Sequence, residues 1–170
     1  ASAIEIFDEI AVIAPPGTGK TTTLLQLTEA ILGYASSVAV FVPLSEWSTR
    51  SDTFFQSLVR RAAFRYARER QFGLLAEHGR LVLILDRWNE LDEPSKRRAR
   101  NDVKSLRRDF PDIRVVVSSR HKDFDIPIDG PVVEVDVLTE EQQLEIAKAR
   151  RGLEGESLMD HAWRTPGLRE

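Results

Sequence analysis

The sequence contains no cysteine, which excludes disulfide bonds and thiolate metal sites. It also lacks a strong excess of one charge: the formal net charge is −3, so no overall basic field argues for nucleic acid as a partner. Long apolar runs are missing as well, and the longest, such as residues 81–85, are far too short to cross a bilayer. No basic segment followed by an apolar one begins the chain. We therefore expect a cytoplasmic protein with no membrane partner.

The 170 residues, 42% of them hydrophobic, are enough for one α/β core. No internal repeat and no low-complexity tract interrupts them. The first residue is not methionine, and the last residues do not resemble the end of a domain. We expect the chain to be a piece of a longer protein.

A glycine-rich motif lies near the amino terminus, where residues 14–21 have the sequence APPGTGKT. Glycines at this spacing let backbone N–H groups surround a polyphosphate, which a lysine and a hydroxyl then hold. The motif follows an apolar segment at residues 10–13 and precedes residues with helical spacing, which is the order that a phosphate-binding loop needs. Ala14 replaces the usual first glycine, at a position that needs a small residue more than a positive φ. The motif predicts binding of a nucleoside triphosphate.

A helix that starts near Gly19 would direct its free N–H groups and the positive end of its dipole at the phosphates. We expect Lys20 to reach the β and γ oxygens and Thr21 to ligate Mg²⁺. The alternative, an ordinary glycine turn before a helix, is disfavoured by the Lys-Thr pair at this offset. The predicted nucleotide-binding residues of the loop are Pro16, Gly17, Thr18, Gly19, Lys20, Thr21 and Thr22.

Strand-like and helix-like segments alternate along the chain, which predicts a parallel sheet with helices on both faces and ligands at the carboxyl ends of the strands. The predicted strands cover residues 10–13, 37–43, 81–85, 113–117 and 132–137. The first predicted helix ends near Gly33, with an apolar side at Leu24, Leu25, Thr28, Ile31 and Leu32. A second, capped by Ser51 or Asp52, carries an apolar stripe from Phe54 to Tyr66, a third runs from Pro94 to near Pro111, and a fourth begins with a capping box formed by Thr139 and Gln142.

The third predicted strand leads into an acidic loop. Asp86 comes at the sheet edge, where it can hold Mg²⁺ directly or through water. Glu90 is expected to polarise the attacking water, and Asn89 to assist by hydrogen bonding to it. Arg120 follows the fourth strand, where it can sense or stabilise the γ-phosphate. The alternative for each of these residues is an ordinary solvated position after a strand.

Five segments together resemble the NACHT-type NTPases of the STAND class of signalling ATPases: APPGTGKTTTLLQL, VAVFVPLSEW, LVLILDRWNELD, IRVVVSSR and VLTEEQQLEIA. The resemblance implies a P-loop NTPase fold, a three-layer α/β/α sandwich whose five-stranded parallel sheet has the order 2-3-4-1-5. That order places the strand of Arg120 between those of Lys20 and Asp86 and directs Arg120 at the γ-phosphate. Two positions depart from the family pattern: Asn89 replaces the first acid of the usual pair, and Arg87 replaces a glycine.

The resemblance also implies a nucleotide-binding core over residues 1–153 and the start of a small helical subdomain over residues 154–170. There, Arg164-Thr165-Pro166-Gly167 resembles a short motif that packs against adenine, so Pro166 is a candidate base contact. The implied cofactors are ATP or ADP and Mg²⁺. The implied partners are C-terminal winged-helix and sensor domains of a longer parent chain and further copies in a nucleotide-dependent homo-oligomer.

The function expected from these features is that of a Mg²⁺-dependent switch that binds ATP and hydrolyses it slowly. Because Asn89 replaces an acid, the sequence is also compatible with a second function, that of an assembly module with negligible hydrolysis. Basic clusters at residues 60–70 and 96–108 keep open a third, a DNA-directed AAA-type ATPase, although most such runs are solvated helix faces.

Overall fold

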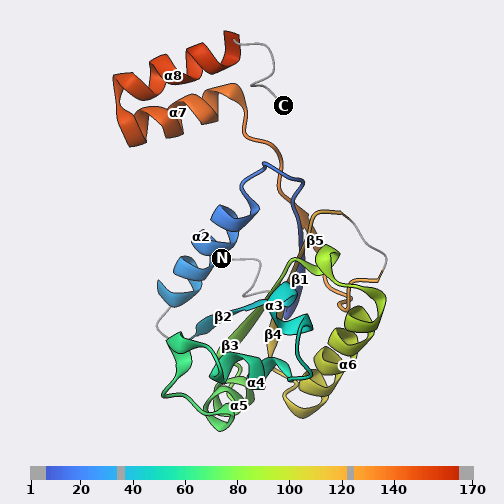
Figure 1. Cartoon of the computed structure of the whole chain (residues 1–170). Helices are drawn as coiled ribbons and strands as arrows, with labels where there is room; N and C mark the ends of the chain where they lie inside the picture. Colours follow the sequence, from blue (N-terminus) through green and yellow to red (C-terminus); the bar gives the residue numbers. More distant parts are fainter. Residues whose placement is uncertain (1–6, 34–36, 122–124, 165–170) are drawn as a thin grey trace. The chain divides into compact units, whose positions relative to one another are not determined.

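The computed structural model describes residues 7–33, 37–121 and 125–164 of the chain. Five parallel strands form one sheet in the order β2-β3-β4-β1-β5 (Figure 1). This arrangement confirms the α/β fold and the sheet order expected from the sequence. The strands are β1 (Glu9–Ile13), β2 (Val38–Pro43), β3 (Leu81–Asp86), β4 (Arg114–Ser119) and β5 (Val132–Glu134).

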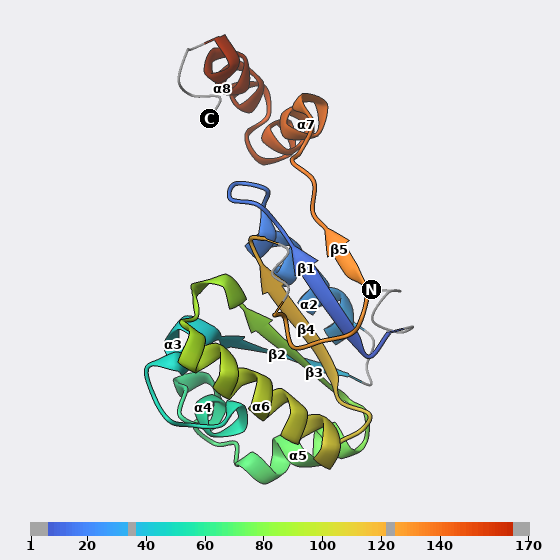
Figure 2. The ribbon, with the colours of Figure 1, turned by 90° about the vertical axis from the view of Figure 1, so that its right-hand side faces the viewer.

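Helices cover both faces of the sheet. On one face, α2 (Lys20–Gly33) packs on β1, β3 and β4. The other face carries α3 (Leu44–Ser48), α4 (Phe54–Val59), α5 (Glu69–Glu77) and α6 (Glu93–Asp109), and Figure 2 shows α4, α5 and α6 together on that side. Two short 3₁₀ helices, η1 (Ala62–Phe64) and η2 (Trp88–Glu90), lie in the connections.

The central strand β3 explains why its sequence is apolar throughout. Leu81, Leu83 and Leu85 enter the core under α3–α6, whereas Val82 and Ile84 enter the core under α2. All five side chains are fully buried. A parallel strand that is covered on both faces needs this composition. Burial on both faces also holds in place the residues at the carboxyl end of the strand.

The region with the apolar stripe from Phe54 to Tyr66 differs from the single helix predicted there. Thr53, rather than Ser51 or Asp52, caps α4 through a capping box with Gln56, and Asp52 instead forms an ion pair with Arg60. The helix ends at Val59, and Tyr66, predicted to lie on its apolar stripe, is 85% exposed.

The break after α4 has a tertiary cause. Arg61 is extended, and its side chain donates a hydrogen bond to the carbonyl of Phe41 in β2. This contact ties the chain to the sheet where a helix would have continued. The helices α3 and α5 were not predicted.

Two smaller corrections concern the edges of predicted elements. Leu25 and Leu32 are each 52% exposed, because α2 faces the sheet along a narrower side that buries Leu24 and Ile31. The fifth strand is also shorter than predicted, with three residues paired to β1, because pairing ends at Glu134.

The chain divides into two compact units, Ala1–Val135 and Asp136–Glu170. In the second, α7 (Glu140–Arg151) packs against α8 (Leu153–Arg164), and the predicted capping box of Thr139 and Gln142 begins α7. A side chain at Gly155 would collide with the backbone of Ala147, so this helix pair requires glycine there. The predicted boundary between residues 153 and 154 stays a prediction. No helix within the described ranges combines the length and apolar character that a membrane span requires.

Candidate functional site

The glycine-rich loop between β1 and α2 has an open interior. Gly17 and Gly19 have φ values of +84° and +81°, in the left-handed region that favours glycine. A Cβ added at either glycine would meet no atom within 4 Å, so the backbone leaves space beside the loop. Thr18 is buried and closes the loop internally, because its Oγ1 donates a 2.8 Å hydrogen bond to the carbonyl of Pro15. The loop leads directly into α2 at Lys20, so the helix amino terminus faces this space.

A cavity of about 280 Å³ lies beside the loop. Its lining consists of residues 14–17 and 19–21 of the loop and first turn, together with Arg87 and Arg120 from the carboxyl ends of β3 and β4. A larger cavity, of about 470 Å³, lies between β2, α3 and α4. No glycine loop borders it, and the helices that line it, α3 and α4, are much shorter than α2. The smaller cavity is therefore the candidate phosphate site.

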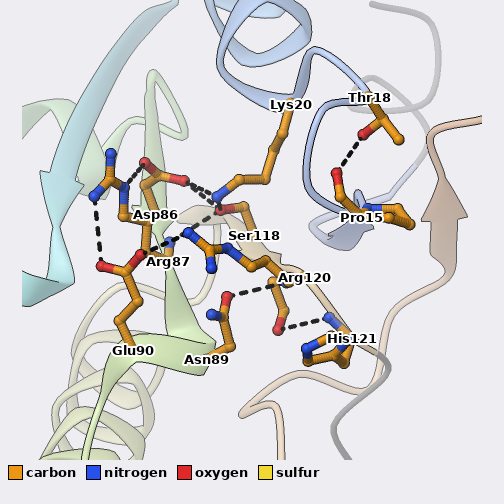
Figure 3. Close-up of polar contacts among 11 residues, drawn as sticks. Pro15, Thr18, Lys20, Asp86, Arg87, Asn89, Glu90, Ser118, Arg120 and His121 are labelled. Atoms are coloured by element: carbon orange, nitrogen blue, oxygen red, sulfur yellow. Dashed lines mark hydrogen bonds and ion pairs between the residues drawn. The ribbon is translucent and has the colours of Figure 1, made fainter. Parts of the chain in front are cut away.

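A partly buried polar network joins the loop to the sheet edge (Figure 3). Lys20 Nζ lies 2.8 Å from Asp86 Oδ1 and donates a second hydrogen bond, of 3.2 Å, to Ser118 Oγ. The Ser118 hydroxyl in turn donates to Asp86 Oδ1 and accepts a 3.0 Å hydrogen bond from the backbone N–H of Arg87. The sheet order produces this meeting, because β4 lies between β1 and β3. Residues far apart in sequence thus come together at one sheet edge.

Ser118 is a residue that the sequence analysis missed. Its side chain is 0% exposed, and its one donor and two acceptor positions are all used. The signal in the sequence was a hydroxyl at the end of an apolar strand. That pattern is common at strand ends and did not distinguish a buried brace from a solvated serine.

The loop after β3 begins with an unusual backbone. Arg87 has φ +68° and ψ +49°, which is the left-handed conformation that a glycine at this position would adopt easily. The glycine-to-arginine departure noted in the sequence therefore falls on a residue whose geometry favours glycine. The turn leads into η2, where Trp88 is fully buried.

Asp125 fixes η2 from the loop after β4. It accepts a 3.2 Å hydrogen bond from Trp88 Nε1 and forms ion pairs with Lys96 and Arg100 of α6. Burial alone would raise the pKa of Asp125, but the hydrogen bonds from Lys96 and Trp88 and the nearby positive charges lower it below its ordinary value. The acidic loop is thus anchored to α6.

Glu90 lies between two arginines (Figure 3). Its Oε2 is 3.4 Å from Arg87 Nη1, and its Oε1 is 3.4 Å from Arg120 Nη2. Asn89 points its Oδ1 at the backbone N–H of Arg120, at 3.0 Å, and so connects η2 to the end of β4. The structure therefore groups Lys20, Asp86, Asn89, Glu90 and Arg120 at one end of the sheet. Their predicted chemical roles stay predictions.

The donors available for Mg²⁺ are few. Thr21 is exposed on the first turn of α2, and the side chain of Asp86 retains 15% exposure. Within the part of the chain that the structure describes, no group of three or more His, Asp or Glu residues is arranged to hold a metal ion. One hydroxyl and one carboxylate fit Mg²⁺, which keeps several waters and takes further oxygens from phosphates. Thr22 is also exposed on the same turn, and Pro166 lies outside the described residues.

Comparisons with known proteins agree with this fold. No protein-family model matches the chain, and no curated protein sequence matches it. Among solved structures, PCH-2 of C. elegans matches 84% of the chain over 39% of its own length, with 19% identity and a TM-score of 0.59. A replication initiator DnaA, in a structure with AMPPCP and single-stranded DNA, matches 99% of the chain over 55% of its own length, with 15% identity and a TM-score of 0.60.

A signal transduction ATPase with numerous domains (STAND) from Pyrococcus horikoshii also matches, with 12% identity over 89% of the chain and 25% of its own length. Its TM-score of 0.45 is too low to support the narrower class. The chain spans about four-tenths to just over half of the length of the first two neighbours. The structural similarity to the first two neighbours and the sheet order show the fold alone: the chain has the α/β fold of P-loop NTPases.

Proposed function

We propose that the chain binds ATP or ADP with Mg²⁺ beside the loop at residues 14–21 and hydrolyses ATP slowly. The observation that carries this proposal is the contact of Lys20 with Asp86 and Ser118 next to an open glycine loop. Lys20 is held by two partners that a phosphate can replace, and backbone N–H groups at the start of α2 face the same space. Mg²⁺, when bound through Asp86 and Thr21, would neutralise charge on the phosphates.

We attribute slow turnover to the single carboxylate of η2. Glu90 can orient water only when a bound triphosphate draws away one of the two guanidinium groups that its oxygens face. Asn89 supplies no second carboxylate and is engaged with the backbone of Arg120. Arg120, at the end of β4, is the residue that we assign to the γ-phosphate.

Calorimetry with ATP, ADP and GTP, with and without Mg²⁺, tests the binding proposal. We expect binding that prefers adenine and that falls at least tenfold in Lys20→Ala, because the ammonium makes charge-assisted hydrogen bonds to phosphate. Full retention of ATP affinity in Lys20→Ala would overturn the proposal. Phosphate release should fall in Glu90→Gln, whereas equal release with intact binding would favour an assembly module that does not hydrolyse ATP.

Among P-loop NTPases, we assign the chain to the STAND-type signalling switches, on the basis of its sequence motifs. Its partners would then be C-terminal winged-helix and sensor domains and, in the nucleotide-bound state, further copies of the chain. Pro166 would contact the adenine base in such a protein. Equal affinity for guanine and adenine nucleotides would count against this assignment.

One observation favours a second function, that of a DNA-directed ATPase. The exposed side of α6 carries Arg97, Lys104 and Arg108, and a DnaA neighbour was solved with single-stranded DNA. Turnover that DNA stimulates, and that high salt abolishes, would establish this function instead. If DNA does not change the rate of ATP hydrolysis, the signalling switch stays the proposed function.

A further inference from the structure

Arg87 has no role in the function proposed above, yet it lies inside the site. Arg87 lines the same cavity as the glycine loop, together with Lys20 and Arg120. Its backbone is held in the left-handed region, and its N–H is bonded to the buried Ser118. An arginine in a conformation that favours glycine is an outlier that suggests a functional reason for the side chain.

The guanidinium of Arg87 is held weakly. Its Nε lies 3.6 Å from Asp86 Oδ2 and its Nη1 lies 3.4 Å from Glu90 Oε2, while the side chain is 50% exposed. Long ion pairs between partly exposed groups contribute little and exchange readily. These two contacts therefore leave the Arg87 guanidinium able to exchange its partners.

The cavity also carries an excess of positive charge. Lys20, Arg87 and Arg120 face two carboxylates, Asp86 and Glu90, so an anion that enters can take the arginines from Glu90. A phosphate offers a guanidinium stronger, paired hydrogen bonds than the two long contacts seen here. Arg87 directly follows β3 and Arg120 directly follows β4, so the two can approach the same ligand from the ends of neighbouring strands.

We propose that Arg87 is a second sensor of the terminal phosphate: it leaves Glu90 when a triphosphate binds and so selects triphosphate over diphosphate. The same movement frees Oε2 of Glu90, which links recognition of the triphosphate to release of the carboxylate. This inference depends on the proposed nucleotide site and adds to it a residue that the sequence pattern would have filled with glycine.

Calorimetric affinities for Mg-AMPPCP and Mg-ADP test the inference. Arg87→Gly removes the guanidinium and suits the local backbone, so the loop keeps its path. We expect the ratio of AMPPCP to ADP affinity to fall about tenfold, the effect of losing one charge-assisted hydrogen bond, with ADP affinity unchanged. Arg70→Ala, which removes an exposed arginine from α5, is the charge-matched control and should leave the ratio as it is.

Two further variants separate the possible outcomes. Arg87→Lys keeps the charge without the two-pronged guanidinium and should lose part of the ratio, which also covers the case in which the glycine variant does not fold. Glu90→Gln weakens the carboxylate that competes with phosphate for Arg87, so the ratio of AMPPCP to ADP affinity should rise. This rise should shrink when Arg87→Gly is added. An unchanged ratio in both Arg87 variants, with wild-type binding intact, overturns the sensor alone. A wild type that binds neither nucleotide overturns the proposed site itself and the sensor with it.

Discussion

Replacing Ser118 by alanine removes one hydroxyl from three hydrogen bonds. The side chain donates to Asp86 and accepts from Lys20 Nζ and from the backbone N–H of Arg87. Ser118 is fully buried, so we expect no water to take the place of its oxygen. The ion pair of Lys20 with Asp86, at 2.8 Å, remains in the variant.

The magnitude follows from what is left without a partner. A buried N–H that loses its acceptor costs about 1–3 kcal/mol, and a hydrogen bond to an ionised acceptor contributes about 1.5–3 kcal/mol. Asp86 keeps Lys20 and some contact with solvent, which offsets part of the loss. We expect the free energy of unfolding to fall by about 2–3 kcal/mol. For a chain of this size, that corresponds to a melting temperature lower by roughly 5–10 °C.

Urea denaturation followed by circular dichroism, at neutral pH and without nucleotide, measures this change. Thr49→Ala is the matched control, because it removes an exposed hydroxyl that donates to the carbonyl of Glu46. The control should change stability by less than about 0.5 kcal/mol. If Ser118→Ala costs no more than Thr49→Ala at an unchanged m-value, the buried network does not brace the site.

Two other perturbations test groups outside the site. Arg107→Ala removes the ion-pair partner of the buried Glu9 and should lower the free energy of unfolding, measured by urea denaturation, by about 3 kcal/mol. Arg108→Ala, on the exposed side of the same helix, should lower it far less. Equal losses would contradict a stabilising role for the pair of Arg107 with Glu9. Burial raises the pKa of Asp102 above its ordinary 3.8, so the folded state binds a proton more tightly than the unfolded state, and stability falls as pH rises from 3.8 through the folded-state pKa. Asp102→Asn should flatten this part of the pH profile, and a variant profile parallel to that of the wild type would contradict this reasoning.

The sheet and the position of the site could be predicted because their signals are local and redundant. The all-apolar run at residues 81–85 has one natural place, a central parallel strand covered on both faces. The glycine loop between an apolar strand and a helix fixes the other half of the site. Parallel topology then brings Lys20 and Asp86 to the same edge, as the structure confirms with a 2.8 Å contact.

Residues 51–78 could not be predicted in the same way, because long-range contacts decide their path. The apolar spacing from Phe54 to Tyr66 suits one long helix, but the hydrogen bond of Arg61 to Phe41 interrupts it. The role of Ser118 could not be predicted for a related reason. Its three hydrogen-bond partners are distant in sequence and meet it only after folding. Sequence patterns report which face a residue occupies, and they do not report which atoms meet across the sheet.

Arg87 shows how a departure from a sequence pattern becomes informative once its backbone is known. An L-residue in the left-handed region costs about 1–2 kcal/mol, whereas glycine avoids that cost but loses about 0.5–1 kcal/mol of unfolded-state entropy on folding. Arg87→Gly should therefore be more stable than Arg87→Ala by about 0.5–1 kcal/mol, since both lack the ion pairs but only alanine keeps the strain. The two variants should nevertheless lose the same triphosphate selectivity, because both lack the guanidinium. If selectivity followed stability between them, the backbone of the loop, and not the arginine side chain, would be what reads the terminal phosphate.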